Sequence, residues 1–232
     1  MVELPTKEEL EKLYHEKGHD ALVWYAWRNN LRALAALGMR PLHEIWDERT
    51  AHHVYTVCRV PLILSCWMTI KRDIFKPMIA DDTEKKAKPI ASASAVVKSS
   101  IYAVKIAYDS DEAIITNAVS SANAMRAAHS FNATFVTVVS TAAMNDYIFL
   151  KNYFGSVGEA LWSSQPLWGK VDEPSWFVEI RKQLDRALRL LDLGFLSDDL
   201  NNLFDNKKNN QRIVNYNNDW SEAITNDSSA LH

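Results

Sequence analysis

Turn-forming residues are scarce in this chain, which has only 6 glycines and 7 prolines among 232 residues. Sheet-rich folds need many tight turns, and glycine and proline supply most of them. No segment shows the sustained alternation of apolar and polar residues that is typical of a strand. The sequence therefore predicts an all-α fold, a single bundle of about 7–9 helices.

The first two helices have recognisable boundaries. Thr6 and Glu9 have the spacing of a capping box, so a helix is predicted to begin there. Gly18 is its natural end, because glycine accepts the left-handed conformation that commonly follows a helix. Asp20 can cap a second helix that runs through Leu37.

One face of this second helix is predicted to be buried. Its apolar residues at helical spacing are Trp24, Trp27, Leu31 and Leu34. Arg28, Asn29 and Arg32 fall outside that stripe, and we expect them on the surface.

Alanine and serine dominate two consecutive segments, 90–108 and 111–152. Small side chains let helix backbones approach closely, so a central pair of long Ala/Ser-rich helices is predicted. Residues 1–205 read as one domain, with a possible internal linker at 77–89. The Asn-rich segment 206–232 reads as a tail that is mobile or docks late in folding.

The formal net charge of -3 is mild, with 26 basic against 29 acidic residues. Direct nucleic-acid binding needs a cationic footprint and is not expected. The N-terminus lacks the pattern of a signal peptide, and the longest apolar run, 54–70, is interrupted by Arg59 and Pro61. Cys58 and Cys66 in this run fit inert buried thiols. We expect a cytoplasmic protein with no membrane partner.

Histidines supply the strongest catalytic pattern. His15 and His19 have the spacing of a zinc-protease motif, which needs both imidazoles on one helical face. Gly18 between them is predicted to end the helix. His52 and His53 are neighbours, which point about 100° apart in a helix and do not easily chelate one metal. We therefore expect no catalytic residue, metal or cofactor, although a helical enzyme or metal-binding protein using either pair stays an alternative, as does a structural adaptor.

Acidic residues gather near the C-terminus. Segment 172–206 has eight acids and four bases, and no base lies between Asp192 and Asp205. A solvated helix end explains such a cluster, and so does a contact with a cationic partner. Leu196 and Leu200 have helical spacing and can either dock the segment or anchor that partner. The candidate partner-binding residues are Asp192, Asp198, Asp199, Asp205, Leu196 and Leu200.

Four segments together resemble a known family. They are the helix WRNNLRALAAL at 27–37, the pair Asn145-Asp146, and the signatures Pro166-Leu167-Trp168 and Pro174-Ser175-Trp176. In this order they resemble helical bacterial proteins found among polymorphic-toxin immunity genes. The resemblance implies a cytoplasmic antitoxin that binds one cognate toxin domain and occludes its active site or substrate surface. The toxin it implies is cationic and often a nuclease.

Overall fold

The structure is a computed structural model that describes residues 2–46, 49–67, 91–108, 111–155, 165–169 and 172–205. The predicted linker at 77–89 and the tail at 206–232 lie outside the described residues. The elements in chain order are α1 (Lys7–Lys17), α2 (His19–Leu34), the 3-10 helix η1 (Ala35–Met39), α3 (Leu42–Ile45), α4 (Thr50–Cys58), α5 (Val60–Trp67), α7 (Ala91–Tyr108), α8 (Asp111–Ala128), α9 (Ala133–Asn152), α11 (Ser175–Leu190) and α12 (Gly194–Phe204). None of the described residues forms a strand, so the all-α prediction is confirmed.

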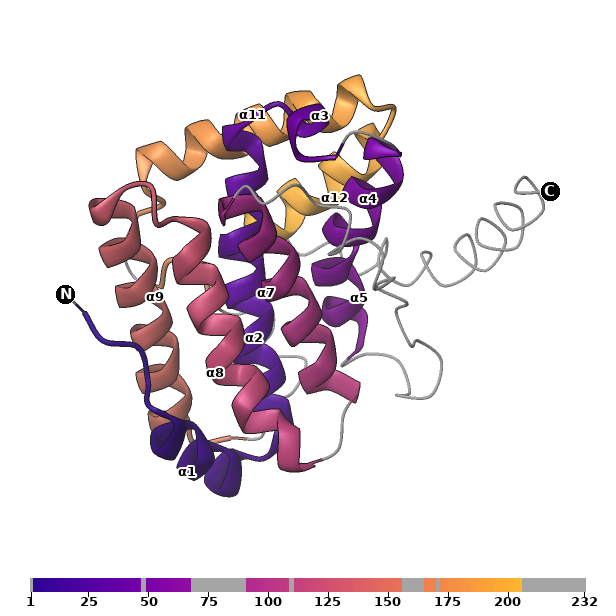
Figure 1. Cartoon of the computed structure of the whole chain (residues 1–232). Coiled ribbons are helices and arrows are strands. Elements are labelled where there is room, and N and C mark those ends of the chain that lie inside the picture. The colour runs from indigo at the N-terminus through magenta and orange to yellow at the C-terminus, as the bar shows by residue number, and fades with distance from the viewer. Residues whose placement is uncertain are drawn as a thin grey trace.

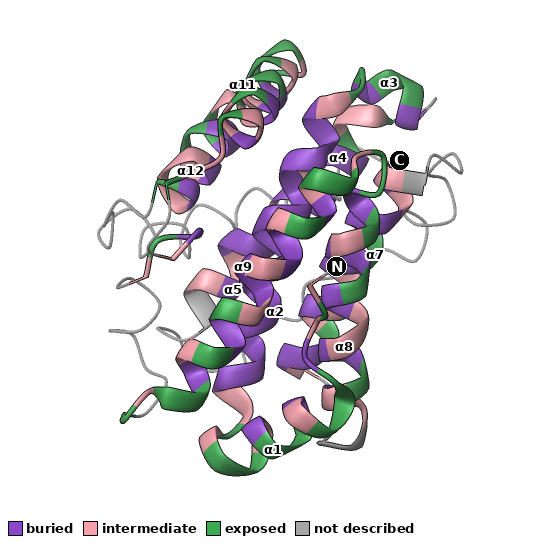
Figure 2. Ribbon diagram, turned by 90° about the vertical axis from the view of Figure 1, so that its left-hand side faces the viewer, coloured by how far each residue is buried: buried purple, intermediate pink, exposed green. Residues whose placement is uncertain are grey.

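Helix α2 runs through the interior of the bundle. It packs against α5, α7, α8 and α9, while α11 crosses one end of the bundle over η1 (Figure 1). Every residue of α2 from Ala21 to Leu34 is buried (Figure 2). The prediction that Arg28, Asn29 and Arg32 face solvent is therefore wrong. All sides of α2 meet other helices, so its polar face is buried together with its apolar one.

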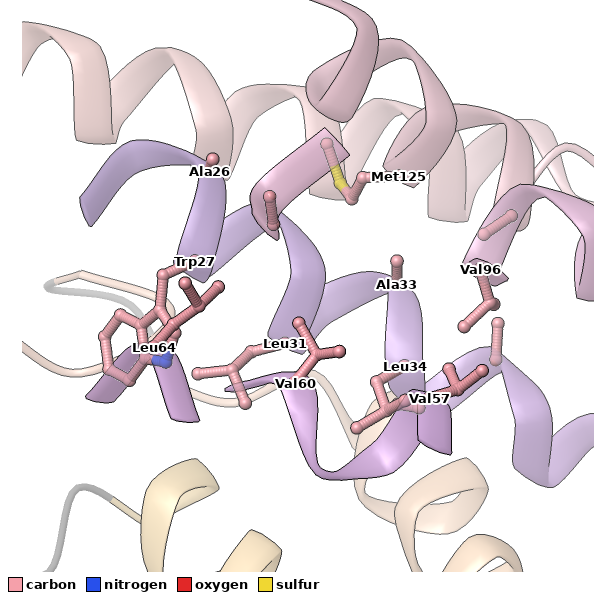
Figure 3. Packing of buried hydrophobic residues seen from close by; sticks show 14 of the residues in the cluster. Ala26, Trp27, Leu31, Ala33, Leu34, Val57, Val60, Leu64, Val96 and Met125 are labelled. Atoms are coloured by element: carbon pink, nitrogen blue, oxygen red, sulfur yellow. The ribbon is translucent and has the colours of Figure 1, made fainter. Parts of the chain in front are cut away.

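The apolar face of α2 behaves as predicted. Trp24, Trp27, Leu31 and Leu34 are all buried. Figure 3 shows Leu31 and Leu34 among side chains from α4, α5 and α7, namely Val57, Val60, Leu64 and Val96. Trp27 also donates its indole N–H to the Pro61 carbonyl oxygen at 2.9 Å, which satisfies the one polar atom of that ring.

The predicted boundaries of the first helix are confirmed. The Glu9 amide donates to Thr6 Oγ1 at 3.2 Å, and the Thr6 amide donates to Glu9 Oε2 at 2.8 Å. Gly18 has a φ of 81° and separates α1 from α2. His15 therefore lies on α1 and His19 on α2.

The predicted long helix at 111–152 is interrupted. Helix α8 ends at Ala128, and α9 begins after Asn132, whose side chain accepts hydrogen bonds from the amides of Thr134 and Phe135. An N-cap of this kind satisfies amides that have no partner within the helix. The most extensive helix contact in the bundle is between α7 and α8. Both helices carry buried alanines, among them Ala103 and Ala118, and such small side chains permit close approach.

Helix α9 has the length and composition of a membrane span, and 39% of its apolar window is buried. The core helices of soluble proteins pass the same test. Asp146 on this helix faces the interior, where it is ion-paired with α2.

The end of α11 is formed by an aspartate and not by the nearby Gly194. The helix ends at Leu190, and Asp192 takes the left-handed conformation with a φ of 60°. The Leu193 amide donates to the Leu188 carbonyl at 2.9 Å and the Asp192 amide to that of Arg189 at 3.2 Å, the pattern of a Schellman cap. Gly194 instead begins α12.

Gly38 lets α11 cross η1 at very short range. A Cβ atom at this position would lie 2.2 Å from the Ile180 carbonyl oxygen and 2.7 Å from the Leu184 amide nitrogen. Both are backbone atoms of α11, so no side-chain movement can relieve the clash.

We predict that Gly38→Ala lowers the free energy of unfolding by about 1–3 kcal/mol or more, because α11 must move away from η1. Urea denaturation measures the loss. Gly194→Ala is the matched control, since its nearest neighbour would be the flexible Arg189 side chain at 3.5 Å. Equal stability of the two variants would contradict the close crossing.

Candidate functional site

A buried cluster of charge joins three separate parts of the chain. Arg28 and Arg32 lie one turn apart on α2, so both side chains leave the same face of the helix. Arg28 Nε lies 2.9 Å from Asp146 Oδ2, and Arg32 Nη1 lies 2.7 Å from the same oxygen. All three residues are at most 4% exposed. We call these three residues, with the carbonyls of 165–167 described next, the arginine centre.

The turn at 165–169 supplies the remaining acceptors. Arg28 Nη1 donates to the Gln165 carbonyl at 2.9 Å, and its Nη2 donates to those of Pro166 and Leu167 at 2.6 and 2.9 Å. Arg32 Nη2 also donates to the Leu167 carbonyl. Gly169, with a φ of 68°, closes this turn by donating its amide to the Pro166 carbonyl. The turn thereby presents three successive carbonyls to α2.

Aromatic rings complete the surroundings of the two guanidinium groups. The Arg28 guanidinium carbon lies 4.5 Å from the centre of the Trp24 ring, and that of Arg32 lies 5.6 Å from the Trp168 ring. These distances are within the range of cation–π attraction. Trp168 is buried, whereas Trp176 is half-buried.

The arginine centre has two cations and a single carboxylate. Burial lowers the pKa of Arg28, and the carboxylate of Asp146 opposes that shift. A buried charge without a partner is very costly, so the carbonyl dipoles and aromatic rings around the second cation are required. The centre therefore fixes α2, α9 and the 165–169 turn in one arrangement.

We predict that Asp146→Asn lowers the free energy of unfolding by about 3–5 kcal/mol, because both buried guanidinium groups lose their counter-charge. Chemical denaturation of the purified variant tests this. Asp172→Asn, at an exposed acid, is the control and is expected to change stability by less than about 0.5 kcal/mol. A loss in Asp146→Asn as small as in the control would show that the charges do not hold the centre together.

His129 adds a neutral polar group beside the centre. Its Nε2 lies 3.0 Å from the Arg32 carbonyl oxygen, which can only accept, so Nε2 carries the hydrogen. Burial lowers the pKa of His129 from its usual 6.5 to about 4. Its ring lies edge-on to Trp176, with 5.5 Å between the ring centres. Protonation would place a third cation close to Arg32.

We predict that acid weakens the fold through His129. Its folded pKa is depressed, so its contribution to stability is complete above pH 6.5 and is lost as the pH falls from 6.5 towards 4. The free energy of unfolding should fall by up to about 1.4 kcal/mol per pH unit over this window from this group alone. The difference between the wild type and His129→Gln, measured from pH 8 to 4, isolates the effect. An unchanged difference would contradict it, and His43→Gln, at an exposed site, is the control.

The histidine pairs weighed as metal sites are not arranged for chelation. His15 and His19 lie on different helices, and His19 Nε2 is 2.5 Å from the Ile106 carbonyl oxygen. His53 is buried and stacked on Trp46, whereas His52 is exposed. Among the described residues, no group of three or more His, Cys, Asp or Glu side chains is placed to hold a metal ion.

Cys58 is equally unsuited to nucleophilic chemistry. Its thiol is buried, and burial raises its pKa, so the reactive thiolate is disfavoured. The side chain of Cys66 lies outside the described residues.

Half of the eight acids in segment 172–206 form ion pairs with two arginines of α11. Arg189 contacts Asp185 at 3.1 Å and Asp198 at 2.5 Å. Burial opposes the ionisation of Asp185, but hydrogen bonds from Ser197 and Arg189 outweigh it and hold the pKa below its usual value. Asp198 is thus part of the contact between the two helices rather than a free acid at a solvated helix start.

Asp205, like Asp198, is paired with an arginine of α11. It contacts Arg181 at 2.7 Å, and Arg181 also contacts Glu173 at 3.1 Å. Each of these two α11 arginines therefore binds two carboxylates, which forms two ion triads of net charge -1. The sequence lacks a base between 192 and 205, but the fold places two arginines of α11, Arg181 and Arg189, beside acids of this segment.

The remaining partner-binding candidates differ in exposure. Asp192 is exposed and Asp199 half-buried, whereas Leu196 and Leu200 are buried. Of the two roles considered for these leucines, the fold gives them the docking of α12 against the bundle, and neither is presented to a partner. Two exposed apolar residues, Leu190 and Phe195, were not identified from the sequence. The buried stripe of α11 consists of Phe177, Ile180, Leu184 and Leu188. Leu190 falls outside that spacing, which was the signal available in the sequence.

No family model matches this chain, and no curated protein or solved structure shows significant similarity to it.

Proposed function

We propose that this chain is an immunity protein that binds one cationic bacterial toxin domain in the cytoplasm and blocks it. The observation that carries the proposal is the negative charge that stays on the α11–α12 surface after its internal ion pairs are formed. The family resemblance of the 27–37, 145–146, 166–168 and 174–176 segments supports the same class of function. A nuclease is the expected toxin, because nucleases that bind phosphate backbones are cationic.

The charge can be followed group by group. The two ion triads contribute -1 each, or -2 together. The other charged residues between 172 and 206 are four acids and two bases, which contribute another -2. They are Asp172, Glu179, Asp192, Asp199, Lys182 and Arg186. The total of -4 exceeds the net charge of -3 for the whole chain, so this segment is the acidic part of an otherwise nearly neutral protein.

The arrangement of the charged side chains in this chain fits a binding protein better than an enzyme. Arg28, Arg32 and Asp146 are the strongest polar cluster among the described residues, yet they are buried and bound to one another and to backbone carbonyls. A reacting group must reach its substrate, which these side chains do not. Inhibition needs only a rigid surface of the right charge and shape, and a rigid interior supports it.

We predict that this chain protects cells from the toxin domain encoded by the adjacent upstream gene and forms a stable complex with it. The rate of association should fall about tenfold or more between low and physiological salt, because screening weakens the attraction between acidic and basic surfaces. Survival assays, co-purification and stopped-flow binding measure the three effects. A toxin domain from an unrelated locus is the control. The absence of protection and of a complex would contradict the proposal.

A further inference from the structure

The turn between α11 and α12 presents two large apolar side chains to solvent. Leu190, at the end of α11, is 86% exposed, and Phe195, at the start of α12, is 50% exposed. Only five large hydrophobic side chains are exposed in the part of the chain that the structure describes, and two of them flank this one turn. Figure 2 shows exposed residues along the outer side of α11. We call residues 190–195 the α11–α12 turn.

Asp192 occupies the tip of this turn in a conformation that favours glycine. With a φ of 60°, it takes the left-handed position of the Schellman cap, where a side chain is disfavoured. The fold does not need a carboxylate here, because the cap is formed by backbone hydrogen bonds alone. A strained residue on an exposed turn is a reason to examine the turn for function.

The carboxylate of Asp192 is the charged group at the tip of the turn. Arg189 is the closest base in the sequence, but it is bound by Asp185 and Asp198 and lies over Gly194. Phe195 rests with its ring centre 6.5 Å from that of Tyr55 on α4, which supports the ring from one side. The turn therefore combines two exposed apolar groups, of which Phe195 is supported by Tyr55, with an acid between them.

We infer that the α11–α12 turn is the anchor of the partner contact, and that the partner presents an apolar recess with a lysine or arginine beside it. The inference rests on the proposed function and names its contact surface. Leu190 and Phe195 supply the apolar area that anchors an interface, and the cation compensates Asp192 as water is removed. An uncharged recess would leave the carboxylate buried and unpaired.

A second copy of this chain is a poorer occupant. In a symmetric contact between two copies the same turn lies on both sides. Where that turn lies on the two-fold axis, each Asp192 approaches the other, and two like charges repel most strongly where water is excluded.

The test compares the affinity of variants for the cognate toxin domain. Leu190→Ser combined with Phe195→Ser should raise Kd about 30-fold or more, as loss of an anchor does. Asp192→Asn, which removes the charge but tolerates the left-handed conformation, should raise Kd about tenfold. Phe131→Ser is the matched control, because Phe131 is 48% exposed on a different turn, between α8 and α9. It should change Kd by less than about twofold.

Asp192→Gly distinguishes a binding role from a structural one. Glycine relieves the backbone at this position, so Tm should rise, while Kd should rise as much as in Asp192→Asn. A purely structural aspartate would raise Tm when replaced but leave Kd unchanged.

The failure of this inference is separable from that of the proposed function. If the wild type binds the toxin domain and both the double variant and Asp192→Asn bind equally well, the turn is not the anchor and the immunity function stands. If the wild type forms no complex, both are overturned. Tm is measured for each variant, and Asp192→Asn alone decides the matter if the double variant does not fold.

Discussion

Asp146 faces two guanidinium groups in the interior of the bundle, and their mutual dependence constrains the rest of the molecule. Neither arginine can be exposed without moving α2, and α2 is surrounded by helices on all sides. The carboxylate of Asp146 neutralises one of the two positive charges. The carbonyls of the 165–169 turn must then lie against α2, because they are the acceptors that make the second buried charge tolerable.

This constraint extends from the centre to the surface through aromatic contacts. Trp168 follows the carbonyls that bind the arginines, and its ring lies 4.8 Å from that of Phe177 at the start of α11. Phe177 in turn contacts Phe204 on α12, with 5.8 Å between ring centres. Gly38 lets the backbone of α11 lie directly on η1. These contacts hold the start of α11 and the end of α12 on the bundle, and the buried Leu188 and Leu196 continue the packing as far as the α11–α12 turn. A rigid surface loses little entropy when it binds.

Local sequence patterns predicted the helices well but predicted poorly where the charged side chains lie and what they pair with. Capping residues and apolar spacing act within a few positions, which is why the limits of α1 and the buried stripe of α2 could be read from the sequence. The partner of Arg28 lies 118 residues away, so no local pattern could place that side chain in the interior. Similarly, the acids near the C-terminus read as unpaired because their arginines stand on the preceding helix.

The α11–α12 turn is a second feature that local sequence patterns could not predict. Glycine commonly takes the left-handed position after a helix, and Gly194 lies close to the end of α11, but Asp192 takes that position two residues earlier. The exposure of Leu190 and Phe195 depends on which faces of α11 and α12 the bundle covers. Three of the sequence segments singled out at the outset, 27–37, 145–146 and 166–168, contain residues of the arginine centre, so much of what was distinctive in the sequence serves packing.

Hydrogen–deuterium exchange of the chain, alone and with the proposed toxin domain, tests most directly whether a rigid interior supports a binding surface at one turn. The toxin is predicted to slow exchange at residues 190–205 and to leave α2 unchanged, because the amides of a buried central helix are already protected. Protection confined to the exposed side of α9, with none at the turn between α11 and α12, would contradict this interpretation.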